Sequence, residues 1–310
     1  MIAALLIQLL QMALILAIAP ALTGLVRKVK ARLQRRRGPS LIQPYRDLRR
    51  LLGKEVVLAD NASWVFRVAP YMIFALTWVA AALVPTFHTG LIFSWSGDLI
   101  AIIALLGSAR FMQALAGMDI GTSFGGIGAS REVMIASLAE PAMLMIVLSV
   151  AIIAGSTQLS TIAAFMASSA VGLRVSLALA LVAFVIVALA ENGRIPVDNP
   201  ATHLELTMVH EAMVLEYSGR HLAMIELASS LKLLLYISAI ACIFVPFGLA
   251  HGYAVGLATY LLKLTIAGVM LAVFETSIAK MRVFRVPNFL GAALMLGLLG
   301  VLLLFVSKGM

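Results

Sequence analysis

The sequence predicts an all-α polytopic membrane protein with eight transmembrane helices. Its 310 residues are 62% hydrophobic and only 12% charged. The apolar runs reach the roughly 20 residues that a helix needs to cross about 30 Å of hydrocarbon. Barrel strands would instead be about 9–11 residues long, with alternating polarity. Since neither a repeat nor a low-complexity linker interrupts these runs, we expect residues 1–310 to form a single integral membrane domain.

The first apolar run could be mistaken for a signal peptide. It has no basic residues before it, and its cations come after it, so we interpret it as a retained span. Seven further runs of similar length follow it along the chain. The expected spans are residues 3–25, 69–87, 98–117, 133–155, 173–191, 219–246, 254–275 and 286–306.

Positive charge divides the connections between these spans into two sets. Twelve of the 23 Lys and Arg residues lie between Arg27 and Arg67, and the third, fifth and seventh connections also carry cations. The other three connections, around residues 88–97, 156–171 and 247–253, carry none. By the positive-inside rule, both termini lie outside and the functional loops are cytoplasmic, at about residues 26–68, 118–132, 192–218 and 276–285. The net charge of +9 thus reflects membrane topology, and we expect no nucleic-acid partner.

The first connection contains a cationic turn and a short amphipathic helix. The turn is Arg35, Arg36 and Arg37, followed by Gly-Pro, and the helix is expected at residues 46–55 with leucines on one face. These cations could be attracted to anionic lipid headgroups or could dock a cytoplasmic subunit. Under the docking interpretation, the further candidate residues are Arg46, Asp119, Ser130 and Arg131.

The third connection is rich in glycine, with five glycines in residues 117–128. It lacks the Walker spacing with its lysine and the strand–turn–helix setting of a dinucleotide site, so nucleotide binding is not favoured. We expect a glycine-rich turn at the bilayer surface, packed against another subunit. Ser130 is then a suitable N-cap for the fourth span, and Glu132 would favour the positive end of that helix.

The fifth connection concentrates carboxylates. Five of the 14 acidic residues fall within 26 positions: Glu191, Asp198, Glu205, Glu211 and Glu216. Residues 201–215 could form a short helix with His203, His210 and Glu211 broadly on one side. The segment is either a solvated loop or a functional cluster. No third ligand accompanies the two histidines at recognisable spacing, and the zinc-protease signature is absent, so we expect no metal site.

Several charges fall inside the expected spans: Arg110, Glu140, Glu226, Lys232 and Lys263. Such groups are costly in hydrocarbon, and they are typically buried in the bundle, paired, or lining a water path. Each could belong to a structural ion pair or to a proton relay, but five together favour a hydrated polar axis. The single cysteine, Cys242, cannot hold an iron–sulfur cluster alone, so any metal centre must belong to a partner.

Three motifs resemble the subunit 1 family of respiratory complex I. They are residues 27–39, residues 191–198 (Glu-Asn-Gly-Arg-Ile-Pro-Val-Asp) and residues 216–219 (Glu-Tyr-Ser-Gly). The resemblance covers nearly the whole chain. Residues 43–47, 119–124, 128–132 and 140–141 are more similar to the membrane subunit of group 4 [NiFe] hydrogenases, which include the formate hydrogenlyase and hydrogenase-4 complexes.

The resemblance implies a non-catalytic subunit that anchors a peripheral electron-transfer arm to a prokaryotic cytoplasmic (inner) membrane. The implied partners are the hydrogenase large and small subunits, an iron–sulfur subunit, antiporter-like membrane subunits and the lipid bilayer. This chain would bind no cofactor itself, because the NiFe centre and the iron–sulfur clusters would lie in the partners. The implied proton or ion pathway comprises Glu132, Glu140, Glu191, Asp198, His203, Glu205, His210, Glu211, Glu216, Lys232 and Lys263.

One departure from the family pattern affects this pathway. The chain is longer than that pattern between Glu191 and Glu216, and Ala201 and His203 stand where further carboxylates are usual. The path could therefore run through His203 or His210, whose unperturbed pKa of about 6.5 suits proton exchange. Alternatively, coupling is weaker in this chain.

Two other functions stay open on the sequence. A quinone-site subunit of a respiratory NADH:quinone oxidoreductase would need an apolar cavity that opens to the bilayer and binds a quinone. A stand-alone cation or proton carrier would transport ions as the purified chain and would have no stoichiometric cytoplasmic partner.

Overall fold

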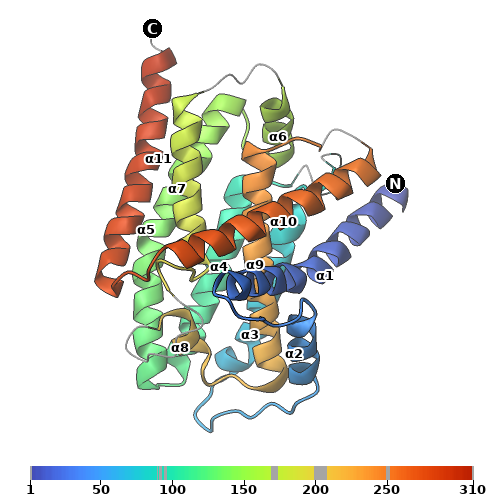
Figure 1. The fold of residues 1–310 in the computed structure, drawn as a ribbon. Coiled ribbons are helices and arrows are strands. Elements are labelled where there is room, and N and C mark those ends of the chain that lie inside the picture. The colour runs from blue at the N-terminus through green and yellow to red at the C-terminus, as the bar shows by residue number, and fades with distance from the viewer. Residues whose placement is uncertain are drawn as a thin grey trace.

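The computed structural model is a bundle of long helices (Figure 1). It describes residues 2–88, 90, 93, 96–168, 174–198, 208–248 and 252–308. Within these ranges every regular element is helical, apart from an isolated bridge between Asp98 and Gln158. The predicted all-α class is confirmed for this part of the chain.

Seven of the described helices are long and apolar enough to cross a membrane. They are α1 (Ile2–Leu33), α3 (Trp64–Leu83), α4 (Leu99–Asp119), α5 (Ser123–Ala154), α9 (Gly219–Phe244), α10 (Tyr253–Ser277) and α11 (Val286–Lys308). The eighth expected span corresponds to α7 (Val175–Glu191), which is apolar but has only 17 residues. The chain is therefore an integral membrane protein, and its eighth span and its orientation stay predictions.

Four shorter elements complete the described fold: α2 (Gln43–Leu52), α6 (Leu159–Ala167), α8 (His210–Val214) and η3 (Val283–Arg285). Helix α2 confirms the short amphipathic helix expected in the first connection, although it begins earlier. Pro44 is buried and Leu48 and Leu51 are half-buried, so these residues form its inner face. Leu52 is 53% exposed and does not belong to that face.

The glycine-rich third connection is mostly helical, which corrects the expected turn at residues 118–132. Helix α5 begins at Ser123, so only residues 120–122 separate it from α4. The N-cap is Thr122, whose side chain accepts a hydrogen bond from the Gly125 backbone N–H at 3.3 Å. Ser130 lies well inside α5 and is not the N-cap.

The glycines of this region permit close helix packing. A Cβ on Gly128 would lie 2.9 Å from the carbonyl oxygen of Val209, and a Cβ on Gly125 would collide with the backbone of Gly117. The glycines therefore let α5 approach α4 and α8. From the sequence alone, a glycine-rich segment suggests a turn. The spacing of the glycines does not show which backbones they bring into contact.

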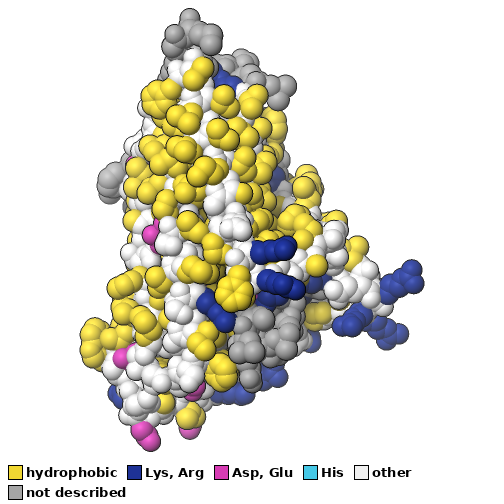
Figure 2. Space-filling view, turned by 90° about the vertical axis from the view of Figure 1, so that its left-hand side faces the viewer, with side chains coloured by type: hydrophobic (Ala, Val, Ile, Leu, Met, Phe, Trp, Pro, Cys, Tyr) yellow, Lys and Arg dark blue, Asp and Glu magenta, His cyan; other side chains and the backbone are white. Residues whose placement is uncertain are grey.

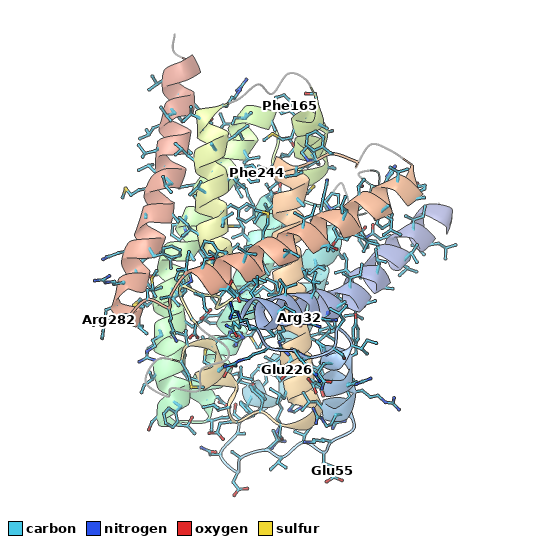
Figure 3. The ribbon with its side chains drawn as sticks, in the orientation of Figure 1. Arg32, Glu55, Phe165, Glu226, Phe244 and Arg282 are labelled. Atoms are coloured by element: carbon cyan, nitrogen blue, oxygen red, sulfur yellow. The ribbon has the colours of Figure 1, made fainter. Side chains whose placement is uncertain are left out.

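The helices divide into an upright group and a tilted pair (Figure 1). Helix α5 packs against α7 and α11, α3 packs against α4 and α9, and α1 packs against α10 across the front. The α1–α3 and α4–α5 connections and helix α8 lie towards the lower end, and α6 lies at the upper end (Figure 1). In Figure 3, Glu55 lies near the bottom of the molecule, whereas Phe165 and Phe244 lie in its upper part.

The side chains on the surface also differ between the upper and lower ends. Figure 2, which views the side of α5, α7 and α11, shows an upper half dominated by hydrophobic side chains. Most Lys and Arg side chains in this view lie lower down or on the projecting right-hand part. A broad apolar band beside a basic end is the surface expected for a membrane-embedded bundle.

The Glu-Tyr-Ser-Gly motif at residues 216–219 joins the first connection to the start of α9. Tyr217 stacks on Phe66 with ring centroids 3.9 Å apart, and its hydroxyl donates to the Phe66 carbonyl at 3.1 Å. The Ser218 hydroxyl accepts from the Val57 N–H at 2.8 Å and donates to the Val57 carbonyl at 2.9 Å. Gly219 has a φ of +53°, which favours glycine. The motif therefore holds the start of α9 against the first connection and the start of α3.

Candidate functional site

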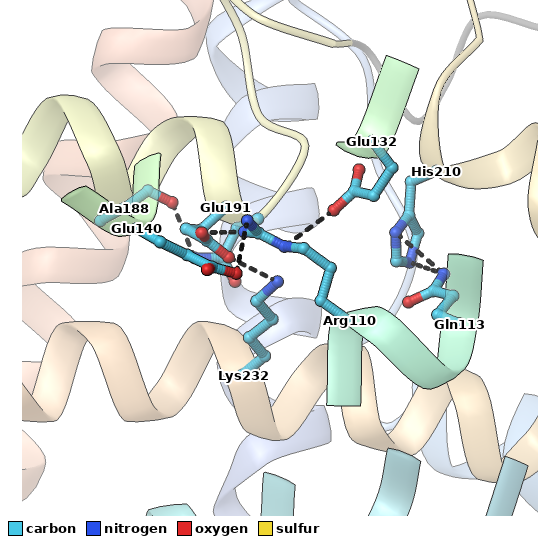
Figure 4. Close-up of polar contacts among 9 residues, drawn as sticks. Arg110, Gln113, Glu132, Glu140, Ala188, Glu191, His210 and Lys232 are labelled. Carbon is cyan, nitrogen blue, oxygen red and sulfur yellow. Dashed lines mark hydrogen bonds and ion pairs between the residues drawn. The ribbon is translucent and has the colours of Figure 1, made fainter. Parts of the chain in front are cut away.

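Arg110, on α4, lies at the centre of three carboxylates (Figure 4). Its Nε lies 3.1 Å from Glu132 Oε1, its Nη1 lies 4.0 Å from Glu140 Oε1, and its Nη2 pairs with Glu191 Oε1. The Arg110 side chain is only 5% exposed. A guanidinium presents five donors in a planar fork, so a single arginine can serve several carboxylates.

Lys232, on α9, completes this buried cluster. Its Nζ lies 2.9 Å from Glu191 Oε2, so Glu191 bridges two cations at the carboxyl end of α7. Three carboxylates and two cations leave one net negative charge when all five groups are ionised. Uptake of one proton would make the cluster neutral, and burial favours the neutral state.

Four helices supply the members of the cluster. Arg110 comes from α4, Glu132 and Glu140 from α5, Glu191 from α7 and Lys232 from α9. The two α5 carboxylates are eight residues apart, or about 12 Å along the helix at 1.5 Å per residue. The Arg110 side chain lies within ion-pair distance of both carboxylates, so the charged groups form a line along α5.

Glu140 is the most accessible carboxylate of the cluster. Its side chain is 46% exposed, whereas those of Glu132 and Glu191 are 11% and 5% exposed. Gly107 on α4 gives it room, since a Cβ there would lie 3.3 Å from Glu140 Oε1. A cavity of about 10 Å³, close to the space for one water molecule, lies between Glu140, Arg110 and Tyr236.

His210 lies beside the cluster and contacts Gln113 (Figure 4). The Gln113 side-chain Nε2 lies 3.1 Å from His210 Nδ1, and Gln113 is one helical turn from Arg110. Burial lowers the pKa of His210 below its ordinary value, and the negative charge of Glu132 opposes this shift. His210 is therefore held in its neutral form.

The lowered pKa of His210 predicts a pH-dependent loss of stability. In the folded chain the imidazole resists protonation, whereas in the unfolded chain it binds a proton near its ordinary pKa of about 6.5. Stability is therefore fully present above about pH 6.5 and falls as the pH drops from there towards the folded-state pKa. We expect His210→Gln to reduce this acid-side loss.

Thermal unfolding of the full chain in detergent at a series of pH values, with and without His210→Gln, measures this contribution. The matched control is His88→Gln, because His88 lies in the connection between α3 and α4. Parallel pH profiles for the original chain and His210→Gln would contradict a neutral buried imidazole.

A second set of ion pairs surrounds Glu275 at the carboxyl end of α10. Lys30 Nζ lies 3.0 Å from Glu275 Oε2, and Arg194 Nη1 lies 3.3 Å from Glu275 Oε1. Close by, Lys280 Nζ lies 2.8 Å from Asp198 Oδ1, and Asp198 Oδ2 accepts the Val209 N–H at 3.2 Å. This set joins α1 and α10 to the segment that follows α7.

The segment from residue 191 to residue 198 connects the two sets. It begins at Glu191 in the Arg110 cluster, continues through Arg194 to Glu275, and ends at Asp198, which pairs with Lys280. A backbone hydrogen bond from the Met281 N–H to the Pro196 carbonyl, at 2.9 Å, also holds it to the chain after α10. Movement of this segment would disturb both sets.

A cavity of about 1070 Å³ adjoins the Glu275 set. Its walls come from α1, α2, α8, α9, the end of α10 and the segment after α7. The charged side chains that line it are Arg27, Lys30, Arg36, Asp47, Arg194, Asp198, Glu211, Glu226, Glu275 and Lys280. His210 also lines this cavity, and its side chain contacts Gln113.

The remaining predicted pathway residues lie apart from the Arg110 cluster. Glu211 lines the large cavity, and Glu216 is exposed beside Tyr217. Lys263 donates to the Val245 and Phe247 carbonyls, just beyond the end of α9. A cation at a helix carboxyl terminus is favourable, so Lys263 caps α9. His203 and Glu205 lie outside the described residues.

The predicted docking residues fall into two groups. Four cations of the first connection, Arg35, Arg36, Arg37 and Arg46, are exposed, and so is Ser130. Asp119 instead accepts the Ser63 N–H at 2.9 Å and fixes the start of α3. Arg131 Nη1 donates to the Met208 carbonyl at 2.8 Å, so this side chain has an internal contact too.

The sequence did not indicate how important two of these residues are. Arg110 is an in-span charge, but nothing in its spacing identifies it as the centre of the cluster. Glu275 is an acidic residue at the end of an apolar run, a signal that could have included it among the candidates. In the described part of the chain, no group of three or more His, Cys, Asp or Glu could hold a metal ion.

Comparison with known proteins gives a consistent family. The model of the NADH dehydrogenase family matches residues 5–306. Formate hydrogenlyase subunit 4 of Escherichia coli is 35% identical over 90% of this chain and 92% of that protein. Hydrogenase-4 component C of the same organism is 34% identical over 88% and 87%. NADH-ubiquinone oxidoreductase chain 1 of Triticum aestivum is 32% identical over 67% and 65%.

The fold also occurs in a solved structure. A chain of the membrane-bound sulfane sulfur reductase, an archaeal respiratory membrane complex, aligns with a TM-score of 0.83 and 23% identity. The alignment covers 97% of this chain and 99% of that chain. At this identity the match supports the helical architecture.

Proposed function

Because the chain belongs to the NADH dehydrogenase family, which includes subunit 1 of complex I, we propose that it anchors and couples a complex I-like membrane-bound [NiFe] hydrogenase. It is a subunit of a membrane oxidoreductase complex, and the proposed location is the prokaryotic cytoplasmic (inner) membrane. Its role would be to hold the peripheral electron-transfer module and to link redox chemistry there to proton or cation movement.

The observation that carries this proposal is the buried Arg110 cluster. A net charge of −1 among these five groups, four of them largely buried, can change by one proton, and burial and neighbouring charge control when it does so. A purely mechanical anchor would not need three carboxylates from two helices around one arginine. The cluster therefore favours a coupling role.

His210 and Glu140 give the proposed path two ends. His210 faces the large cavity and contacts Gln113, one turn from Arg110. Glu140 is nearly half exposed on a membrane helix, a position too costly to face lipid. We infer that a neighbouring membrane subunit, of the antiporter-like class, covers Glu140 and exchanges protons with it.

The peripheral module would dock at the Arg35–Arg36–Arg37 turn. All three side chains are exposed, and Arg36 also lines the rim of the large cavity. The proposed partners are the hydrogenase large and small subunits and an iron–sulfur subunit, which would hold the NiFe centre and the clusters. Complementary charge would orient this contact.

Reversing one charge tests this docking site. We expect Arg36→Glu to loosen the peripheral module, since acidic groups opposite the turn would then meet a like charge. The measurement is the amount of peripheral subunits that co-purify with the tagged chain at increasing salt. Arg174→Glu is the matched control, because Arg174 is exposed next to α7 at the opposite end of that helix from Glu191. Intact co-purification from Arg36→Glu would count against the site.

A mild-detergent pull-down tests the proposed function itself. Nickel and hydrogen-dependent dye reduction in the purified complex would support the hydrogenase assignment. NADH-dependent quinone reduction without nickel would replace it with the respiratory one. Ion transport by the chain alone, with no co-purifying partner, would favour a carrier, although the relatives are named as subunits or components of complexes.

The large cavity supports the second candidate, a quinone-site subunit. Its volume of about 1070 Å³ is at the upper end of what a small-molecule site needs. Its charged walls at Lys30, Arg194 and Glu275 differ from the apolar chamber that the sequence led us to expect for a quinone. Inhibition of NADH-dependent quinone reduction by a quinone analogue would favour this candidate.

A further inference from the structure

Helix α2 presents an arginine stripe away from the rest of the molecule. Ile42, Arg46 and Arg49 follow one another at helical spacings of four and three, and all three are exposed. Arg50 lies beside this stripe. It is exposed and pairs with Asp47, whereas no ion pair within the described ranges engages Arg46 or Arg49. The fold itself therefore does not use these two guanidinium groups.

The opposite face of α2 fixes the helix against membrane spans. Pro44 is buried, Leu48 and Leu51 are half-buried, and α2 packs against α1 and α9. The Tyr45 hydroxyl donates to the Ala17 carbonyl inside α1. Helix α2 is therefore held beside two spans, with its stripe directed outwards.

Large exposed apolar side chains lie at both ends of α2 and at the start of the next span. Leu41 and Ile42 precede α2 and are 40% and 58% exposed, and Leu52 at its end is 53% exposed. Trp64, the first residue of α3, is 71% exposed. Tryptophan at the end of a span is typical of the boundary between hydrocarbon and headgroups. A surface with exposed apolar side chains and arginines is better suited to that boundary than to contact with bulk water.

We propose that the outer face of α2 binds the headgroups of anionic phospholipids, with Arg46, Arg49 and Arg50 contacting phosphate. Arginine binds phosphate through two parallel hydrogen bonds. Leu41, Ile42 and Leu52 would contact the adjoining acyl chains. Such lipids would seal the outer side of α2, whose inner residues Pro44, Asp47 and Leu48 line the large cavity.

Native mass spectrometry of the full chain, released from nanodiscs with equimolar phosphatidylglycerol and phosphatidylcholine, tests this site. We expect the chain to retain phosphatidylglycerol preferentially. The variant Arg46→Gln/Arg49→Gln/Arg50→Gln should lose that preference by about fivefold for each arginine removed. The variant Arg35→Gln/Arg36→Gln/Arg37→Gln removes the same charge from the neighbouring turn and should keep it.

Two outcomes would overturn the lipid site. One is equal retention of phosphatidylglycerol by both triple variants, which would mean that only total charge matters. The other is unchanged lipid retention by the α2 variant together with loss of the peripheral subunits when that variant is co-purified from cells as in the Arg36→Glu test, which would make the stripe a protein-docking surface. If the triple variant does not fold, the single variant Arg49→Gln gives the same comparison, because its side chain is exposed and unpaired within the described residues.

Discussion

Arg110→Met is expected to destabilise the chain by about 3–5 kcal/mol, because it leaves buried carboxylates without their shared cation. The cluster would change from three carboxylates and two cations to three carboxylates and one cation, and its net charge from −1 to −2. Within the described residues Lys232 forms an ion pair with Glu191 alone, so it does not replace the lost contact with Glu132. The measurement is the unfolding temperature and monodisperse yield of the full chain in detergent.

A second substitution separates charge balance from packing. In Arg110→Met/Glu132→Gln, two carboxylates and one cation remain, so the net charge returns to −1. We expect the double variant to recover much of the lost stability, since it removes both ends of one buried pair. Arg50→Met is the matched control, because its pair with Asp47 is exposed and contributes at most about 1 kcal/mol. A double variant less stable than Arg110→Met would contradict this account.

The predictable part of the fold came from the length and polarity of the apolar runs. These properties place helices reliably because a bilayer imposes a minimum span. They do not show which backbones meet, which is why the Gly-rich residues 118–132 suggested a turn, although residues 123–132 form the start of α5. Glycine permits a turn and a close helix contact equally well, and only the position of Gly117 against Gly125 distinguishes them.

The candidate site was predictable only in part. Charge within the expected spans selected Arg110, Glu140 and Lys232, and the family resemblance added Glu132 and Glu191; the structure brings these five residues together. Their role in a proton or ion pathway stays a prediction. The same reasoning chose Lys263, which instead caps the end of α9. A cation in a membrane span can be compensated by carboxylates, as for Lys232, or by carbonyls at a helix end, as for Lys263. The sequence does not distinguish these two cases. Glu275 was missed because its partners Lys30 and Arg194 are distant along the chain.

Glu140→Gln is expected to uncouple the complex without removing its hydrogenase chemistry. Glu140 is the accessible end of the Arg110 cluster, and glutamine keeps its size but cannot take up a proton at this position. Its 4.0 Å contact with Arg110 is the longest in the cluster, so we expect little loss of stability. Ion movement should fall to background, while hydrogen-dependent dye reduction stays within about twofold because no group at the redox centre changes.

The measurement is hydrogenase turnover and proton uptake of the purified complex in the same sealed vesicles. Glu55→Gln is the matched control, because Glu55 is an exposed carboxylate at the end of the molecule far from the cluster. Gly107→Leu offers an independent test, since a larger side chain there would press on the Glu140 carboxylate without removing it. If both Glu140→Gln and Gly107→Leu leave the ratio of protons moved to hydrogen consumed unchanged, the axis through Glu140 carries no coupled proton. If both lower that ratio while turnover persists, the exposed end of the Arg110 cluster is where charge leaves this subunit.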